Sequence, residues 1–237
     1  MDAAIFVVDD SAKDPDAELW YAEPPGFTAL PLQALLPRHG TSAGDELRTA
    51  VAPLLESAPS ELVRQQFIAC FSSAQQYLGA LCGIGTVNCS IGLHRDDVND
   101  SAAGMGSQPL LSLLTLSWCD TPVAPRGVTA ARAVAGVERH ERVEFLELPC
   151  GPVTVSETIR VASPGSGLPR HPLLQIHAHA PHPDCKRMAV LTLSTTAVAR
   201  REQYRAILRR IAGTVSFDDP LAEAAAEVEV EAMRAGP

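Results

Sequence analysis

Long apolar runs and basic side chains are both scarce in this sequence of 237 residues. No uninterrupted apolar stretch approaches the roughly 20 residues that a membrane-spanning helix needs, so we predict no membrane insertion. Lysine occurs only as Lys13 and Lys186, and the formal net charge is −9. Because nucleic-acid binding depends on clustered cations that neutralise phosphates, this balance argues against nucleic acid as a partner.

Closely spaced cysteine pairs and an export signal are also missing. The six cysteines include no Cys-x-x-Cys pair and stand mostly among apolar residues, as free thiols do in a reducing cytoplasm. Acidic Asp2, Asp9 and Asp10 occupy positions where a secretory signal has basic residues. We therefore predict a cytoplasmic protein whose cysteines fill the core.

Recognised catalytic motifs are absent as well. No serine lies in a G-x-S-x-G motif, no glycine-rich loop opens a helix, and no H-E-x-x-H sequence occurs. The acidic segment HRDDVND, residues 94–100, lacks the ligand spacing of a calcium loop, and we interpret it as a solvated loop. Cys89 falls on the apolar face of a predicted strand, where burial raises a thiol pKa and disfavours nucleophilic attack. We expect no catalytic residue and no cofactor.

What the sequence does contain is a clear alternation of helical and strand periodicities. The first forty residues indicate short extended segments, and two helices follow, one from Asp45 that Pro53 should kink and one from Pro59 to Gly83. A short helix at 128–137 and one through Tyr204 and Ile211 come later. The predicted strands are residues 86–94, 110–119, 142–148, 153–161, 173–180, 188–194 and 214–217.

The order of these elements predicts a single α+β domain over residues 1–217. Its parts are an extended and helical region, 1–83, and a sheet-rich region, 84–217, with cooperative folding expected from about residue 19. Residues 218–237 form an acidic tail that we expect to be helical or disordered. The sequence has no internal repeat and no linker long enough to indicate a second domain.

The segment QIHAHAPHPDC, residues 175–185, holds the candidate metal ligands His177, His179 and His182. Metal ligands must converge on one point about 2 Å from each donor atom, so ligands on a strand must share one face. His177 and His179 share a face with Gln175, because side chains alternate along a strand.

The expected hairpin register argues against metal binding. A four-residue turn at 181–184 pairs Ala180 with Cys185 and places Lys186 opposite His179, which directs Cys185 to the apolar face and an ammonium toward the histidines. We therefore expect two solvent-facing strand histidines, a third in the turn, and no stoichiometric metal. A metal site built from His177, His179 and His182 remains the alternative.

The C-terminal part of the chain carries a family resemblance. A strand ending in L-T-L-S-T, Leu191–Thr195, precedes a helix with Tyr204 near its start and a segment F-D-D-P, Phe217–Pro220. Residues 173–220 resemble the last hairpin, helix and strand of the PsbP-like fold. That family includes a photosystem extrinsic subunit, a nuclear-import factor that binds a small GTPase, and LpqN-type actinobacterial proteins, some associated with type VII secretion.

The resemblance implies both a fold and a role. The fold is an antiparallel sheet covered by helices on both faces, an α/β/α sandwich, here with an N-terminal helical extension. The implied role is a non-catalytic protein-binding or accessory module, linked to a secretion system or a secreted effector, with another protein as its partner. A homo-oligomer stays open, and a metal-dependent or small-molecule-binding enzyme using His177, His179 and His182 is the alternative.

Overall fold

A computed structural model describes residues 7–8, 19–30, 32–36, 41–56, 60–94, 110–135, 140–161 and 171–218. The segments 95–100 and 219–237, predicted as a solvated loop and most of the acidic tail, lie outside the described residues. The helices are α1 (Leu32–Leu35), α2 (Ser42–Glu56), α3 (Glu61–Gly83), α4 (Arg126–Ala135) and α5 (Arg201–Ala212), with a 3₁₀ turn at Val198–Arg200. The strands are β1 (Val7–Val8), β2 (Ala22–Glu23), β3 (Phe27–Ala29), β4 (Thr86–His94), β5 (Leu110–Asp120), β6 (Glu141–Leu148), β7 (Gly151–Arg160), β8 (Leu173–Pro181) and β9 (Arg187–Thr195).

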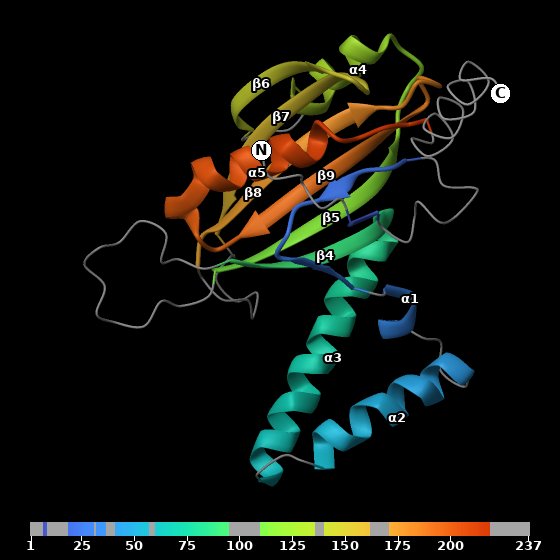
Figure 1. The fold of residues 1–237 in the computed structure, drawn as a ribbon, viewed down its shortest axis with the longest axis vertical. Coiled ribbons are helices and arrows are strands. Elements are labelled where there is room, and N and C mark those ends of the chain that lie inside the picture. The colour runs from blue at the N-terminus through green and yellow to red at the C-terminus, as the bar shows by residue number, and fades with distance from the viewer. Residues whose placement is uncertain are drawn as a thin grey trace, which may run out of the picture.

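Seven strands form one antiparallel sheet in the order β3-β4-β5-β9-β8-β7-β6 (Figure 1). The chain is therefore α+β, as predicted. Strand β5 lies inside the sheet between β4 and β9, as its apolar composition predicted. Leu114 and Leu116 on its core face are buried, whereas Leu111 on the other face is 57% exposed, so cover on that second face is only partial. The predicted strand at 214–217 is wrong: Ser216 forms only an isolated bridge with Trp20.

One face of the sheet packs against α5. Tyr204, Leu208 and Ile211, spaced three or four residues apart on one side of this helix, are buried in the main core. Leu19 and Tyr21 join the same core. The N-terminal segment therefore completes the layer that α5 begins.

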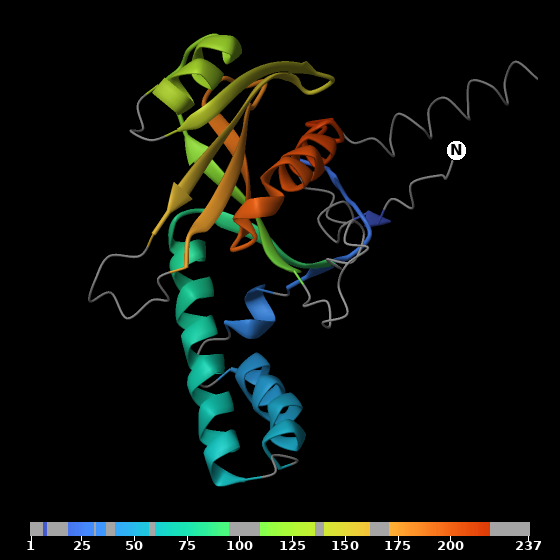
Figure 2. The same cartoon turned by 90° about the vertical axis from the view of Figure 1, so that its left-hand side faces the viewer.

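The opposite face has much less helical cover (Figure 2). Helix α4 packs over β7 and β8, where the Thr154 hydroxyl donates to the Ala130 carbonyl over 2.9 Å. Cover by helices on both faces is thus not confirmed across the whole sheet. Much of this second face, over β4, β5 and β9, lies beyond α4. The whole of the second face, including the part over β7 and β8, is called the open face below.

Helices α2 and α3 extend away from the sheet beside β4 (Figure 1). Ser60 caps α3, its hydroxyl accepting from the Val63 amide over 3.3 Å, so the helix begins at Glu61. Helix α2 continues through Pro53 and ends at Glu56, so this proline does not split the helix in two. Among the described side chains of α3 only Leu78 is fully buried, and Leu62 is 66% exposed.

Candidate functional site

The histidines at positions 177 and 179 lie on the open face of the sheet, and a third histidine that the sequence analysis did not single out joins them. His140, just before β6, has its ring centroid 5.5 Å from that of His177 and 5.9 Å from that of His179. The His177 and His179 centroids are 5.9 Å apart. The expectation that both strand histidines face solvent is wrong, because His179 is 7% exposed and His177 is only partly exposed.

His182 lies away from this histidine cluster. Its ring packs against Trp118 and Phe217, with centroid distances of 5.8 and 4.9 Å, and its Nδ1 is 3.1 Å from the Asp184 carboxylate. The three predicted candidates, His177, His179 and His182, therefore do not converge on one point.

The predicted hairpin register is also wrong. Ala180 pairs with Ala189 and His179 with Val190, so neither Cys185 nor Lys186 stands opposite the strand. Strand β8 continues through Pro181, whose carbonyl accepts two hydrogen bonds from Arg126, and the turn becomes longer than four residues. Cys185 takes a positive φ of 59° in that turn.

The histidine cluster is electrically neutral at ordinary pH. Burial, followed by the nearby His179, His140 and Arg160, lowers the pKa of His177 from 6.5 to about 3. Burial and His140 lower the pKa of His179 to about 4, and burial lowers the pKa of His140. His140 Nδ1 bonds the Ser156 hydroxyl over 2.8 Å, and His177 Nδ1 bonds that of Thr192 over 3.0 Å.

Metal binding finds no support in this arrangement. Within the part of the chain that the structure describes, no three His, Cys, Asp or Glu side chains are grouped so as to hold a metal ion. That the purified protein carries no stoichiometric metal stays a prediction, which elemental analysis would test.

The open face carries a groove with a volume of about 600 Å³. This size is within the usual range of ligand pockets, roughly 300–1,000 Å³. One side, called the apolar side below, comes from the end of α3 and from β4 and β5. Its most exposed residues, Tyr77, Ile84 and Leu111, are large and apolar, although Thr86, Ser112, Thr115 and Ser117 also line it. The other side is polar and comes from β7, β8 and β9. Its side chains include Arg160, Gln175, His177, Thr192 and Ser194.

The alternation of side chains along β8 and β9 explains why one side of the groove is polar. His177 pairs with Thr192, and Gln175 with Ser194, so their polar side chains project to one face while Leu174, Ile176 and Leu193 project into the core. The predicted shared face of Gln175, His177 and His179 was therefore the signal for the polar side. The contribution of α3 had no such local signal.

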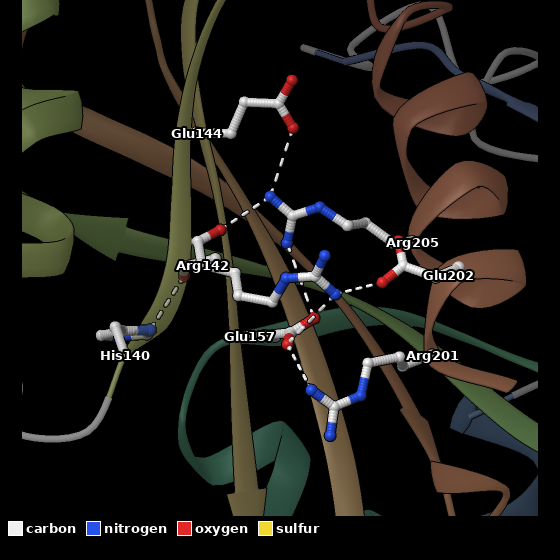
Figure 3. Close-up of polar contacts among 8 residues, drawn as sticks. His140, Arg142, Glu144, Glu157, Arg201, Glu202 and Arg205 are labelled. Atoms are coloured by element: carbon white, nitrogen blue, oxygen red, sulfur yellow. Dashed lines mark hydrogen bonds and ion pairs between the residues drawn. The ribbon is translucent and has the colours of Figure 1, made fainter. Parts of the chain in front are cut away.

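A second polar cluster lies on the face covered by α5 (Figure 3). Glu157 of β7 is 0% exposed, and its carboxylate faces the guanidinium groups of Arg201 at 3.3 Å, Arg205 at 3.7 Å and Arg142 at 3.9 Å. Arg205 also donates to the Arg142 carbonyl over 2.7 Å. Because Arg201 and Arg205 are four residues apart on α5, both can reach the same strand.

Three of the described cysteine thiols, those of Cys89, Cys119 and Cys150, are poorly suited to nucleophilic catalysis. Burial, with smaller effects of Cys82 and Glu23, raises the pKa of Cys89 to about 11, as its predicted place on an apolar strand face implied. Burial also raises the pKa of Cys119 and of Cys150.

A scan against protein-family models and searches of curated proteins and solved structures found no significant match. The resemblance to the PsbP-like fold is therefore neither supported nor contradicted by relatives. Among the described helices, none is long and apolar enough to cross a membrane. The fold and the site define an α+β protein with an open, grooved sheet face.

Proposed function

We propose that this chain is a non-catalytic binding module whose partner is another protein, and that the partner lies in the groove on the open face. The groove itself carries this proposal. Tyr77, Ile84 and Leu111 line it and yet are 56%, 68% and 57% exposed. Large apolar side chains gathered at one exposed concave surface are typical of interaction sites.

Helix α3 extends this apolar surface beyond the groove. Val63 and Leu62, further toward its N-terminus on the same side of the helix as Tyr77, are 40% and 66% exposed. A partner that packs along this side of α3 would bury these apolar residues. The binding surface that we propose therefore comprises the groove and the adjoining face of α3.

The competing function is a small-molecule-binding enzyme at the same groove. Of the three histidines in the original alternative, only His177 lines it. A neutral imidazole that bonds a threonine hydroxyl can orient a ligand, but the groove places no carboxylate or thiol beside it among its described lining residues. The geometry therefore favours binding.

The family and location are part of the same proposal. An α/β/α sandwich of the PsbP-like type, with an N-terminal helical extension, agrees with the observed succession of β8, β9 and α5. An accessory role in type VII secretion would follow from that family. The free thiols of Cys82, Cys89, Cys119, Cys150 and Cys185 agree with a cytoplasmic location.

Site-specific photocrosslinking tests the binding role. Benzoylphenylalanine replaces Tyr77 in the groove, and a matched control replaces exposed Gln203 on α5, which packs on the other face. In the cells that express the protein, we expect the Tyr77 probe to capture one defined protein that the Gln203 probe does not. Identical products from both positions, or none from Tyr77, would reject the proposal.

A further inference from the structure

The groove contains one charged side chain among its described lining residues, that of Arg160. Arg160 ends β7 and pairs with Leu173 of β8, and its side chain is exposed. Within the described ranges, its guanidinium has no hydrogen bond or ion pair with another side chain. No carboxylate lines the groove there to neutralise it.

The neighbouring polar groups are partly satisfied by one another. Gln175 donates to the Ser194 hydroxyl over 3.3 Å, and His177 bonds Thr192. Arg160 differs from them, since its planar fork of donors remains available. Arginine binds carboxylates with two parallel hydrogen bonds, and such charge-assisted bonds are stronger than neutral ones.

The apolar side of the groove indicates that the ligand also carries apolar groups. Tyr77, Ile84 and Leu111 offer apolar surface to a chain that approaches Arg160 from the α3 side. Their exposure shows a groove open to solvent rather than closed around a small ligand. An open groove suits a segment of a larger molecule.

We propose that the groove recognises a partner segment in which an acidic residue is flanked by apolar residues, with the carboxylate held by Arg160. This inference rests on the proposed binding function and specifies its partner. The chain has a net charge of −9, so its overall charge repels acidic segments. A preference for acid must therefore arise locally, at Arg160.

Selection from a displayed library of random heptapeptides tests this chemistry. The baits are the wild type, Arg160→Gln, and Arg210→Gln, a control at an exposed position of α5. We expect wild type and Arg210→Gln to enrich peptides that combine Asp or Glu with apolar residues. Arg160→Gln should lose the acidic enrichment and keep the apolar one.

A synthetic peptide from the wild-type selection gives the quantitative check. Its Asp→Asn or Glu→Gln counterpart should bind wild type roughly tenfold more weakly, as expected for one charge-assisted hydrogen bond, and should bind Arg160→Gln no more weakly than the acidic peptide does. Equal thermal transitions of the three proteins show that folding is unchanged.

Several outcomes overturn the inference: no enriched peptide, enrichment without acidic residues, or acidic enrichment that persists in Arg160→Gln. Binding of dodecanoate without any peptide selection would assign the groove to a small carboxylate instead. The two proposals fail separately. Capture of a protein at Tyr77 without an acidic preference rejects only the inference, whereas acidic selection without any captured protein rejects the proposed function.

Discussion

At the scale of single residues, Glu157 is the most constrained charge of the described chain. It has 0% exposure and stands opposite Ile176 in the core face of the sheet, where an ion without partners would be costly. Three arginines compensate it, and Arg205 is itself only 8% exposed. The cluster links α5 to β7 in addition to the apolar packing of the helix, so its loss should weaken the contact between helix and sheet.

We expect Glu157→Gln to lower the free energy of unfolding by roughly 1–3 kcal/mol, because buried Arg205 then keeps only Glu144, at 3.2 Å, as a carboxylate partner. Urea denaturation of wild type and variant measures the difference. Glu202→Gln is the matched control, since Glu202 pairs with Arg142 at the surface with 62% side-chain exposure and should change stability little. Equal effects of the two substitutions would contradict this account of the cluster.

At the scale of elements, strand β8 makes the fold sensitive to acid. The pKa values of His177 and His179, about 3 and about 4, lie below the ordinary 6.5. Between about pH 6.5 and these folded pKa values, the unfolded chain therefore binds more protons at the two histidines than the folded chain does. With respect to these two histidines, the free energy of unfolding is highest above about pH 6.5, and it decreases as pH falls toward the folded pKa values.

We expect the free energy of unfolding to fall between pH 6.5 and pH 5 with a slope of up to about 1.4 kcal/mol per pH unit for each histidine. Urea denaturation at pH 7.5, 6.5, 5.5 and 5 measures it, above the range where carboxylates such as Asp184, with a pKa of about 2, contribute. His177→Gln/His179→Gln should flatten the slope. A flat wild-type profile would show that the histidines are not buried as neutral imidazoles.

At the scale of the whole molecule, the two ends of the described fold are joined. Trp20 and Ser216 exchange two backbone hydrogen bonds of 2.9 Å, and Leu19 and Tyr21 share a core with α5 and the sheet strands. Helix α3 contributes little to that core, because Leu78 belongs to a separate small cluster with Leu32 and Cys89. Sheet and α5 should therefore unfold together, and outer α3 should open first.

We expect one thermal transition for the protein, with coincident midpoints from tryptophan fluorescence and far-ultraviolet circular dichroism. Hydrogen exchange should be slowest in β8, β9 and α5 and much faster in the N-terminal half of α3, where few described side chains are buried. Two resolved transitions would show that the chain is not a single cooperative domain over residues 19–217.

Local sequence pattern determined the type of most elements. Apolar residues on both faces predicted the interior strand β5. The spacing of Tyr204, Ile207, Leu208 and Ile211 predicted the inner face of α5, on which Ile207 is only partly buried. Alternation placed Gln175, His177 and His179 on one face. These predictions held because helix and strand periodicity is set by backbone geometry, which acts within a few residues.

Tertiary structure determined which residues the faces of these helices and strands contact. It brought His140 to the strand histidines, moved His182 to Trp118 and Phe217, and lengthened the β8–β9 turn by extending β8 through Pro181. It also formed the groove between α3 and the sheet and gathered arginines around Glu157. Such contacts join residues far apart in the chain, and packing and strand register, rather than local pattern, determine them.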